Sequence, residues 1–256
     1  MELWTPEHIR SLLPATAVML LIAVVLRCLL GKCEWKIRMI PLQIIAVLIV
    51  LLEIGKQALS LKQGYDLYHL PFHFCSLFIF MLPLAAFYRG KRRQTVLAIT
   101  ASLCTSVMLL MLIYPNLIYS GGNVVNFFHG FFDFHTVAFH NLVLFAAILF
   151  PALQLHTPAP KAEGKSVMLF TIGFCLVSAT MAQLLETNFN NFYSCNIGPL
   201  ENVRISLQAS LGYGLTQALY VVIVTLMDIG FVQMCYWLYR GLRKLTNCIA
   251  KAPAEN

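Results

Sequence analysis

The stretch RMIPLQIIAVLIVLLEIGKQALS (38–60) is apolar over most of its length and long enough to form a membrane-spanning helix. The hydrocarbon core of a bilayer is about 30 Å thick and takes about 20 helical residues. Near its end the stretch carries one acidic side chain, Glu53, with Gln57 one helical turn further on. The segment therefore predicts a transmembrane helix with polar groups close to one membrane face.

The composition of the whole chain agrees with a membrane protein. Of its 256 residues 59% are hydrophobic and 11% are charged, whereas about 25% of the residues of a soluble domain are charged. We predict an all-α, polytopic bundle of seven transmembrane helices that forms a single transmembrane domain over residues 1–256. The seven predicted spans are 11–30, 38–60, 70–88, 95–114, 131–153, 166–186 and 213–239.

The distribution of basic residues predicts the orientation of this bundle. Fourteen of the 18 Lys and Arg residues fall in three connections, at the span ends beside them or in the C-terminal tail, all on one side of the predicted spans, and four fall on the other. Cytoplasmic loops carry an excess of Lys and Arg, so we expect an N-terminus outside and a C-terminus in the cytoplasm of a multi-pass cell-membrane protein. The net charge of +7 follows from these loops, and no nucleic-acid partner is predicted. The three basic connections are 31–37, 89–94 and 156–165, and the segment 156–166 is predicted to be a solvated linker.

With this topology, most of the unusual polar residues lie at one level near the outer face. Five of the seven histidines are among them. Ionisable residues inside membrane spans usually face a bundle interior or a wet cavity and mark function. The polar residues at this level are Glu53, Gln57, His69, His73, Cys75, His129, Asp133, His135, His140, Gln183, Asn188 and Asn190.

Cys75 is the strongest candidate for a chemical role at this level. A thiolate is a nucleophile, and an adjacent imidazole both lowers the pKa of the thiol and takes its proton. His73 lies only two residues away, but residues two apart on a helix point in different directions. The base for Cys75 is therefore expected from another span, and the alternative is a cysteine that simply packs in the membrane.

The fifth predicted span supplies the candidate base. In a regular helix His129, Asp133 and His140 share one face, because offsets of four and seven residues return close to it, whereas His135 points elsewhere. An Asp beside a His can fix the imidazole tautomer. We expect His140 within reach of Cys75, and the alternative for His129 and Asp133 is that they lie in the interface and contact water.

Two other classes of function compete with this interpretation. Imidazole is the commonest metal ligand, so the histidines with Glu53 could serve a metal-dependent membrane enzyme. The chain has no HExxH motif or other recognised ligand spacing, and no metal and no cofactor are predicted. A transporter could use the same His and Glu groups to relay protons or bind a solute, although the internal repeat that many transporters carry is absent.

Three short motifs resemble a known family. The segments LPFHFCSL (70–77), FHTVAFH (134–140) and TNFNN (187–191) are similar to motifs of the YwaF-type bacterial integral membrane proteins. That family is similar to the eukaryotic transmembrane protein 164 acyltransferases and, more remotely, to the androgen-induced-gene membrane hydrolases. The resemblance covers most of the chain. It implies an intramembrane nucleophile, falling on Cys75, paired with a histidine of another span, falling on His140 or His135.

The sequence and the resemblance together predict a cysteine-dependent acyltransferase or acyl hydrolase. Its partner would be a membrane phospholipid or another acyl lipid, which forms a thioester at Cys75 while His140, with His135, serves as the base. Amides near the TNFNN motif could stabilise the oxyanion. The residues predicted to bind substrate are His73, Glu53, Gln57, His129, Asp133, Gln183, Asn188 and Asn190.

Overall fold

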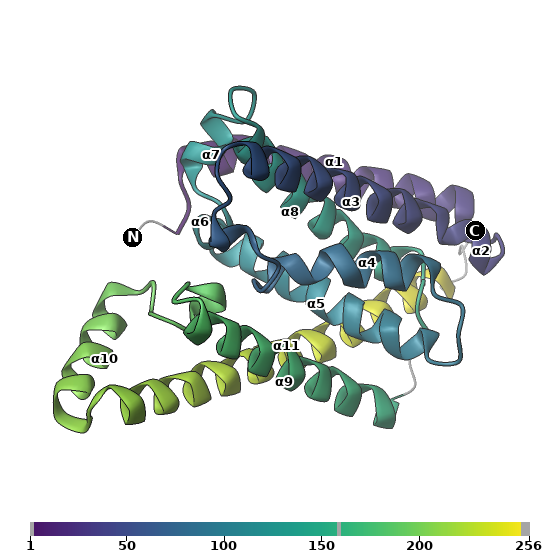
Figure 1. Cartoon of the computed structure of the whole chain (residues 1–256). Helices are drawn as coiled ribbons and strands as arrows, with labels where there is room; N and C mark the ends of the chain where they lie inside the picture. Colours follow the sequence, from purple (N-terminus) through teal and green to yellow (C-terminus); the bar gives the residue numbers. More distant parts are fainter. Residues whose placement is uncertain (1–2, 158–159, 252–256) are drawn as a thin grey trace.

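The computed structural model describes residues 3–157 and 160–251, with side chains at 3–157 and 163–246. Within these residues all regular secondary structure is helical, which confirms the predicted all-α fold (Figure 1). The α-helices are α1 (Pro6–Leu30), α2 (Trp35–Arg38), α3 (Ile40–Lys62), α4 (Phe78–Phe87), α5 (Arg93–Ile113), α6 (Pro115–Ile118), α7 (Gly121–Val125), α8 (Phe131–Ala152), α9 (Pro160–Leu184), α10 (Gly198–Leu211) and α11 (Tyr213–Lys251). Three short 3-10 helices are η1 (Leu67–His69), η2 (Cys75–Leu77) and η3 (Phe189–Asn191).

Six helical segments of the described chain are long and apolar enough to cross a membrane. They coincide with six of the seven predicted spans, and the seventh corresponds to a shorter apolar helix, Cys75–Phe87. The chain is therefore a multi-pass membrane protein with a polytopic helical bundle. The six long segments are Pro6–Leu30, Trp35–Lys62, Arg93–Ile113, Phe131–Ala152, Glu163–Leu184 and Tyr213–Thr246.

The predicted span 70–88 is helical only from Cys75 onward. Proline restricts the residue before it to extended conformations, and Leu70 adopts such a conformation (φ −63°, ψ 147°) before Pro71. The chain then turns, with the Ser76 N–H donating to the carbonyl of His73 at 3.0 Å. The assumption that His73 and Cys75 lie on one regular helix was therefore wrong.

The core of the bundle forms around α5. This helix packs against α4, α8, α9 and α11, and it is buried without interruption from Leu97 to Val107. Small residues such as Ala98 and Ala101 let neighbouring backbones approach closely. The hydroxyls along this stretch bond within their own helix, as when Ser102 Oγ donates to the Ala98 carbonyl at 2.7 Å. Four long or apolar helices are thus packed directly on one buried span.

The segment between α9 and α11 contains a helix that was predicted as an outer loop. In α10 the apolar residues Leu200, Val203, Leu207 and Leu211 recur every three or four positions, the pattern of an amphipathic helix. A turn at Gly212 with φ +77° joins it to α11, a conformation that glycine adopts readily. In Figure 1, α10 and the first part of α11 form a hairpin that projects away from the remaining helices.

The basic connections gather at one end of the bundle, as the charge count predicted. Trp35 Nε1 donates to the Leu155 carbonyl at 2.8 Å, Arg38 donates to the Leu153 carbonyl at 2.9 Å, and the Arg93 guanidinium lies 3.8 Å from the ring centre of Trp35. These contacts join the connections that follow α1, α4 and α8. The side of the membrane on which they lie stays a prediction.

The prediction of a solvated linker at 156–166 was wrong for His156 and Glu163, which are both buried. His156 is fully buried, and its Nε2 lies 2.9 Å from the Glu163 carboxylate. Its Nδ1 lies 3.2 Å from the Tyr239 hydroxyl of α11. Residues 158 and 159 lie outside the described residues. The polar composition of the connection predicted exposure to solvent, but His156 and Glu163 are instead buried at the basic end of the bundle.

Candidate functional site

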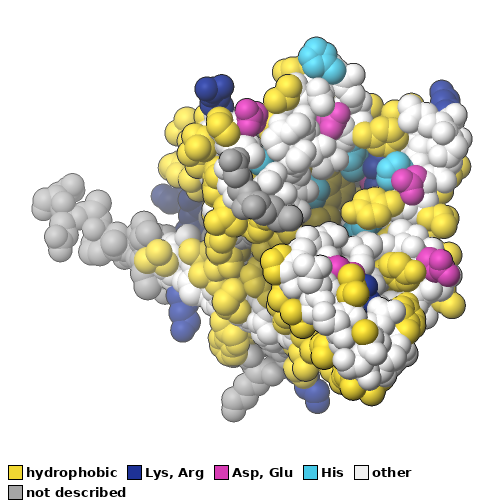
Figure 2. Space-filling view, turned by 90° about the vertical axis from the view of Figure 1, so that its left-hand side faces the viewer, with side chains coloured by type: hydrophobic (Ala, Val, Ile, Leu, Met, Phe, Trp, Pro, Cys, Tyr) yellow, Lys and Arg dark blue, Asp and Glu magenta, His cyan; other side chains and the backbone are white. Residues whose placement is uncertain are grey.

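A cavity of about 920 Å³ lies between two walls of the bundle. One wall comes from α3, the turns around η1 and η2, α5 and α8, and the other from η3, α10 and α11. Most of the lining side chains are apolar. Figure 2 shows this face of the molecule hollowed, with histidine side chains in and beside the hollow. The volume falls in the range of about 300–1,000 Å³ that is typical of ligand pockets.

The cavity brings together seven of the eleven residues that the sequence predicted for the site. These are Cys75, His140, His135, His73, Glu53, Asn188 and Asn190. The other four do not belong to its lining. They are Gln57, His129, Asp133 and Gln183.

The imidazole of His140 has one nitrogen fixed and one nitrogen unpaired. Its Nδ1 lies 2.7 Å from the carbonyl of Thr136, one helical turn earlier in α8. Because a carbonyl can only accept, Nδ1 carries the proton, and the neutral ring keeps its lone pair on Nε2. Nε2 is buried and has no hydrogen-bond partner among the described residues. His140 thus presents a proton acceptor in the lining of the cavity.

Cys75 lines the same cavity from the start of η2 and has a free thiol. The turn that carries it packs through Phe74, whose ring centre lies 6.2 Å from that of Phe174 in α9. Since Nε2 of His140 is unpaired, no hydrogen bond joins the two side chains here. Catalytic hydrogen bonds are often long before substrate binds and tighten afterwards.

Glu53 lies at the centre of a buried polar cluster on the α3 side of the cavity. Its Oε1 accepts from Gln57 Nε2 at 2.7 Å and lies 2.8 Å from the Lys56 ammonium. Its Oε2 lies 3.3 Å from Nε2 of His135 in α8. Lys56 was not among the predicted site residues, although a lysine three residues after a glutamate inside an apolar run is a recognisable signal.

His73 is held by the turn that precedes Cys75. Its Nε2 lies 3.1 Å from the Tyr68 carbonyl and therefore donates to it. The ring packs between Tyr68 and Phe189, with ring centres 4.3 Å and 5.3 Å away. One hydrogen bond and two aromatic contacts therefore fix the orientation of the His73 ring.

Of the predicted common face of His129, Asp133 and His140, only Asp133 and His140 lie on the same helix. Helix α8 begins at Phe131, after the extended residue Gly130 (φ −135°, ψ 131°), so His129 lies in the preceding turn and is exposed. The carboxylate of Asp133 accepts from Asn123 Nδ2 of α7 at 2.6 Å. The interfacial alternative therefore describes His129, whereas Asp133 is half-buried and bonded to Asn123. Glu53 is the carboxylate that lies beside a span histidine, His135.

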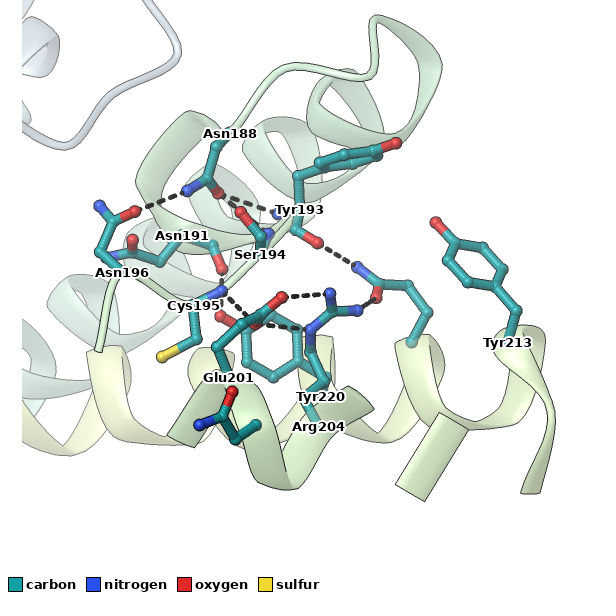
Figure 3. Close-up of polar contacts among 12 residues, drawn as sticks. Asn188, Asn191, Tyr193, Ser194, Cys195, Asn196, Glu201, Arg204, Tyr213 and Tyr220 are labelled. Atoms are coloured by element: carbon teal, nitrogen blue, oxygen red, sulfur yellow. Dashed lines mark hydrogen bonds and ion pairs between the residues drawn. The ribbon is translucent and has the colours of Figure 1, made fainter. Parts of the chain in front are cut away.

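The amides near the TNFNN motif hold the loop that leads into α10 (Figure 3). Asn188 Oδ1 accepts from the backbone N–H groups of Tyr193 and Ser194 at 3.2 and 3.1 Å, and Gln183 Nε2 donates to the Phe192 carbonyl at 2.9 Å. Asn190 is different, because its Nδ2 donates across the cavity wall to α11.

An ion pair closes this loop at the start of α10. Arg204 Nε donates to Glu201 Oε2 at 2.8 Å, and the backbone N–H of Cys195 donates to the same oxygen at 2.8 Å (Figure 3). The Arg204 guanidinium lowers the pKa of Glu201 below its usual value. Arg204 also lines the cavity, and its role was missed because α10 was read as a loop.

No group of three or more His, Cys, Asp or Glu side chains that could hold a metal ion occurs among the described residues. Among the histidines of the cavity, His73 and His140 donate to carbonyl oxygens, and Nδ1 of His69 lies 2.7 Å from Ser60 Oγ.

Comparisons with known proteins agree with the resemblance seen in the motifs. A family model described as the TMEM164 family matches residues 3–236, which includes all the residues predicted for the site. No curated protein matches the chain, and no solved structure matches it. Because the matched region covers nearly the whole sequence, the chain belongs to the TMEM164 family.

Proposed function

We propose that this protein is a cysteine-dependent lipid acyltransferase or acyl hydrolase that acts within the membrane. Cys75 is the nucleophile and His140 is the base. The acyl donor is a membrane phospholipid or another acyl lipid, whose chain occupies the apolar part of the cavity.

One observation carries this proposal. A free thiol and an imidazole nitrogen with an unused lone pair line the same largely apolar cavity, which is large enough for part of a lipid. The carbonyl of Thr136 fixes the tautomer of His140 in the form that can take a proton. A triad aspartate does the same in serine proteases by bonding to the imidazole nitrogen that faces away from the nucleophile.

The first half-reaction transfers an acyl group to the enzyme. Nε2 of His140 takes the thiol proton, and the sulfur of Cys75 attacks the ester carbonyl carbon. As the new C–S bond forms and the C–O ester bond breaks, the imidazolium returns the proton to the departing alcohol oxygen. The products are a thioester on Cys75 and a lipid with a free hydroxyl.

The second half-reaction releases the acyl group. A second hydroxyl, an amine or water attacks the thioester carbonyl, and its proton passes to Nε2 of His140 as the new bond forms. The C–S bond breaks, and the thiolate of Cys75 regains a proton from the imidazolium. Water as the attacking group gives a hydrolase, and a lipid acceptor gives a transferase.

In this proposal the neighbouring polar groups orient the reacting groups and the substrate and form no covalent bond with the substrate. The Glu53 carboxylate, anchored by Lys56 and Gln57, orients the imidazole of His135 beside the reacting pair. His73, fixed by the Tyr68 carbonyl, positions the substrate rather than serving as the base. Asn188 and Gln183 are used by the loop and Asn190 Nδ2 donates to Asp228, so we assign the oxyanion to none of these three side-chain amides.

A turnover assay with matched cysteine variants tests the proposal. The purified protein is mixed with phospholipid that carries a labelled acyl chain, with and without a lysophospholipid acceptor. Cys75→Ala should remove release or transfer of the label. Cys195→Ala is the matched control, because Cys195 also lines the cavity and has no role in the proposed steps, and it should retain turnover.

Comparison of the two variants separates the loss of a nucleophile from a general change in the shape of the cavity. Equal loss of turnover in both variants would mean that the assay reports cavity integrity and not a nucleophile. Full turnover by Cys75→Ala protein would refute the proposal.

A second candidate function is transport of a proton or a solute. The observation that favours it is the Glu53–Lys56 ion pair, which is buried in a membrane segment and lines a cavity. In vesicles containing the protein, a solute or proton flux that persists in Cys75→Ala and disappears in Glu53→Gln would support transport over acyl transfer.

A further inference from the structure

Asp228 is the second acidic side chain in the lining of the cavity, and the steps above give it no role. It lies in the membrane-spanning part of α11 and lines the same cavity as Cys75. A carboxylate inside a membrane span is energetically costly, and one that faces a cavity marks a functional site by default.

The partners of Asp228 leave its charge without a neighbouring cation. Its Oδ2 accepts from Asn190 Nδ2 at 2.9 Å and from the Cys175 thiol at 3.7 Å. No ion pair involves Asp228 among the described side chains, whereas Glu53 has Lys56 at 2.8 Å. The Oδ1 atom of Asp228 has no hydrogen bond to any described residue. The carboxylate therefore has one oxygen held by the protein and one free for a donor.

Helix α9 brings Asp228 to the level of the candidate nucleophile. Cys175, which bonds to Asp228, follows Phe174, and the ring of Phe174 packs against that of Phe74 beside Cys75. One turn further along α9, Ser178 Oγ donates to the Phe72 carbonyl at 2.8 Å. Through these contacts α9 holds the Asp228–Cys175 pair at about the same level along the bundle as the turn that carries Cys75.

The other partner of Asp228 leads to the same turn. Asn190 follows Phe189, whose ring centre lies 5.3 Å from that of His73. Asn190 has φ +51°, a left-handed conformation that asparagine tolerates better than most residues. Cys175 and Asn190, the two partners of Asp228, are therefore each next in sequence to a phenylalanine that packs on the turn before Cys75. Asp228 and Cys75 line the same cavity, so we expect a ligand bound at Cys75 to lie near Asp228.

We propose that Asp228 binds the acyl acceptor, accepting a hydrogen bond from the hydroxyl group that attacks the Cys75 thioester. The inference rests on the proposed acyl-transfer function. A hydroxyl donates its hydrogen to the carboxylate and keeps lone pairs for attack. An ammonium group would also bind there, but its nitrogen has no lone pair until it loses a proton. Hydroxyl and ammonium groups can both donate a hydrogen bond to Asp228. Only the hydroxyl can attack the thioester without first losing a proton.

The step balances without any additional reagent. The acceptor hydroxyl binds with its single hydrogen towards Asp228. As its oxygen bonds to the thioester carbonyl carbon, the O–H turns and passes that hydrogen to Nε2 of His140, and the C–S bond breaks. The thiolate of Cys75 takes that proton back, and the acylated acceptor leaves. Asp228 stays ionised throughout and orients the hydroxyl, which makes it an acceptor-binding residue.

The test compares the two half-reactions in Asp228→Asn protein. With labelled donor phospholipid alone, the amount of hydroxylamine-sensitive acyl label on Cys75 should match that of the wild type. With lysophospholipid added, the KM for this acceptor should rise by about tenfold, as expected for the loss of a hydrogen bond to a charged group. Cys175→Ala is the matched control, since it removes the weaker partner of the same carboxylate and keeps the charge, and its acceptor KM should stay unchanged.

Further outcomes decide between this inference and its alternatives. Wild-type protein that forms no acyl-Cys75 would overturn the proposed function as a whole. Normal acyl-Cys75 together with an unchanged acceptor KM in Asp228→Asn would overturn only the role of Asp228. An effect seen with an amine-bearing acceptor, and not with lysophospholipid, would also overturn it.

Asp228→Glu covers the case in which Asp228→Asn does not fold. It keeps the charge and moves it by one methylene, so it should form acyl-Cys75 and raise the acceptor KM. An unchanged KM in this variant would again count against the inference.

Discussion

At the scale of single residues, the buried ion pair between Glu53 and Lys56 affects the stability of the folded protein. The Lys56 and Glu53 side chains are 14% and 9% exposed, so both charges are largely out of water. A buried pair adds little net stability compared with apolar residues, but removal of one partner leaves the other charge uncompensated. The pair therefore adds little to the stability of the folded protein, but the loss of either partner should destabilise it.

Glu53→Gln should destabilise the protein by about 3 kcal/mol, because the Lys56 ammonium then has no buried counter-ion. Thermal unfolding in detergent measures this. The exposed Glu34→Gln, which has the same change of chemistry, should shift stability by less than about 0.5 kcal/mol. Adding Lys56→Met to Glu53→Gln should recover part of the loss. A Glu53→Gln protein as stable as the wild type would show that the pair is not buried as described.

Cys75 and His140 should behave as one catalytic unit. Removal of a positioned general base costs on the order of 10²–10⁴ in rate. His140→Ala should lose turnover by about this factor, and the Cys75→Ala/His140→Ala double variant should be no worse than Cys75→Ala, as in other nucleophile–base pairs. His73→Ala should retain partial activity. Steady-state kinetics of the four proteins would reveal independent effects if the losses multiply.

The residue types of this site could be predicted from the sequence better than their pairings. Ionisable groups in apolar runs identified Glu53, Cys75 and the span histidines, because such groups are costly in lipid. Their partners depend on where each helix starts. Extended Gly130 delays α8 to Phe131, so His129 lies outside the helix and its predicted spacing with His140 does not apply. Asp133 lies in α8 but bonds to Asn123 of α7.

At the scale of elements, the short helix α4 and the hairpin of α10 and α11 determine the shape of the cavity. Pro71 prevents a continuous helix through the turn before Cys75, and α10 supplies an apolar face to the opposite wall. Span detection by hydropathy finds long apolar helices. It could not find α10, because alternating polar residues lower its mean hydropathy, and it extended the third span into a turn.

The Glu201–Arg204 pair should stabilise the start of α10 in a pH-dependent way. The pKa of Glu201 is lowered in the folded protein, so its contribution is present above the unfolded value of about 4.3 and is lost as the pH falls through the lower folded value. The melting temperature of wild-type protein should exceed that of Glu201→Gln at neutral pH and converge with it at acidic pH. Glu186→Gln serves as the control. A difference that grows on acidification would contradict this account.

At the scale of the whole molecule, the basic connections lie together at one end and the cavity residues lie towards the other. The contacts of Trp35, Arg38 and Arg93 hold that basic end together. The positive-inside rule predicts that this end is cytoplasmic, and we therefore predict that the candidate site lies towards the outer leaflet.

Single cysteines in a cysteine-reduced protein test this orientation. Glu34→Cys and Lys91→Cys lie at the basic end and should react with a membrane-impermeant maleimide only after cells are permeabilised. Gln63→Cys lies beyond the opposite end of α3 and should react in intact cells. The reverse pattern would invert the topology.

The most direct test of the central claim is detection of the acyl-enzyme itself. Purified protein is incubated with phospholipid in the absence of an acceptor, quenched at low pH and analysed by intact-protein and peptide mass spectrometry. The account predicts a mass increase of one acyl group on the peptide that contains Cys75. Neutral hydroxylamine should remove the group, and Cys75→Ala protein should lack it. An acyl group found on another residue, or lipid turnover by protein that never carries one at Cys75, would contradict the account.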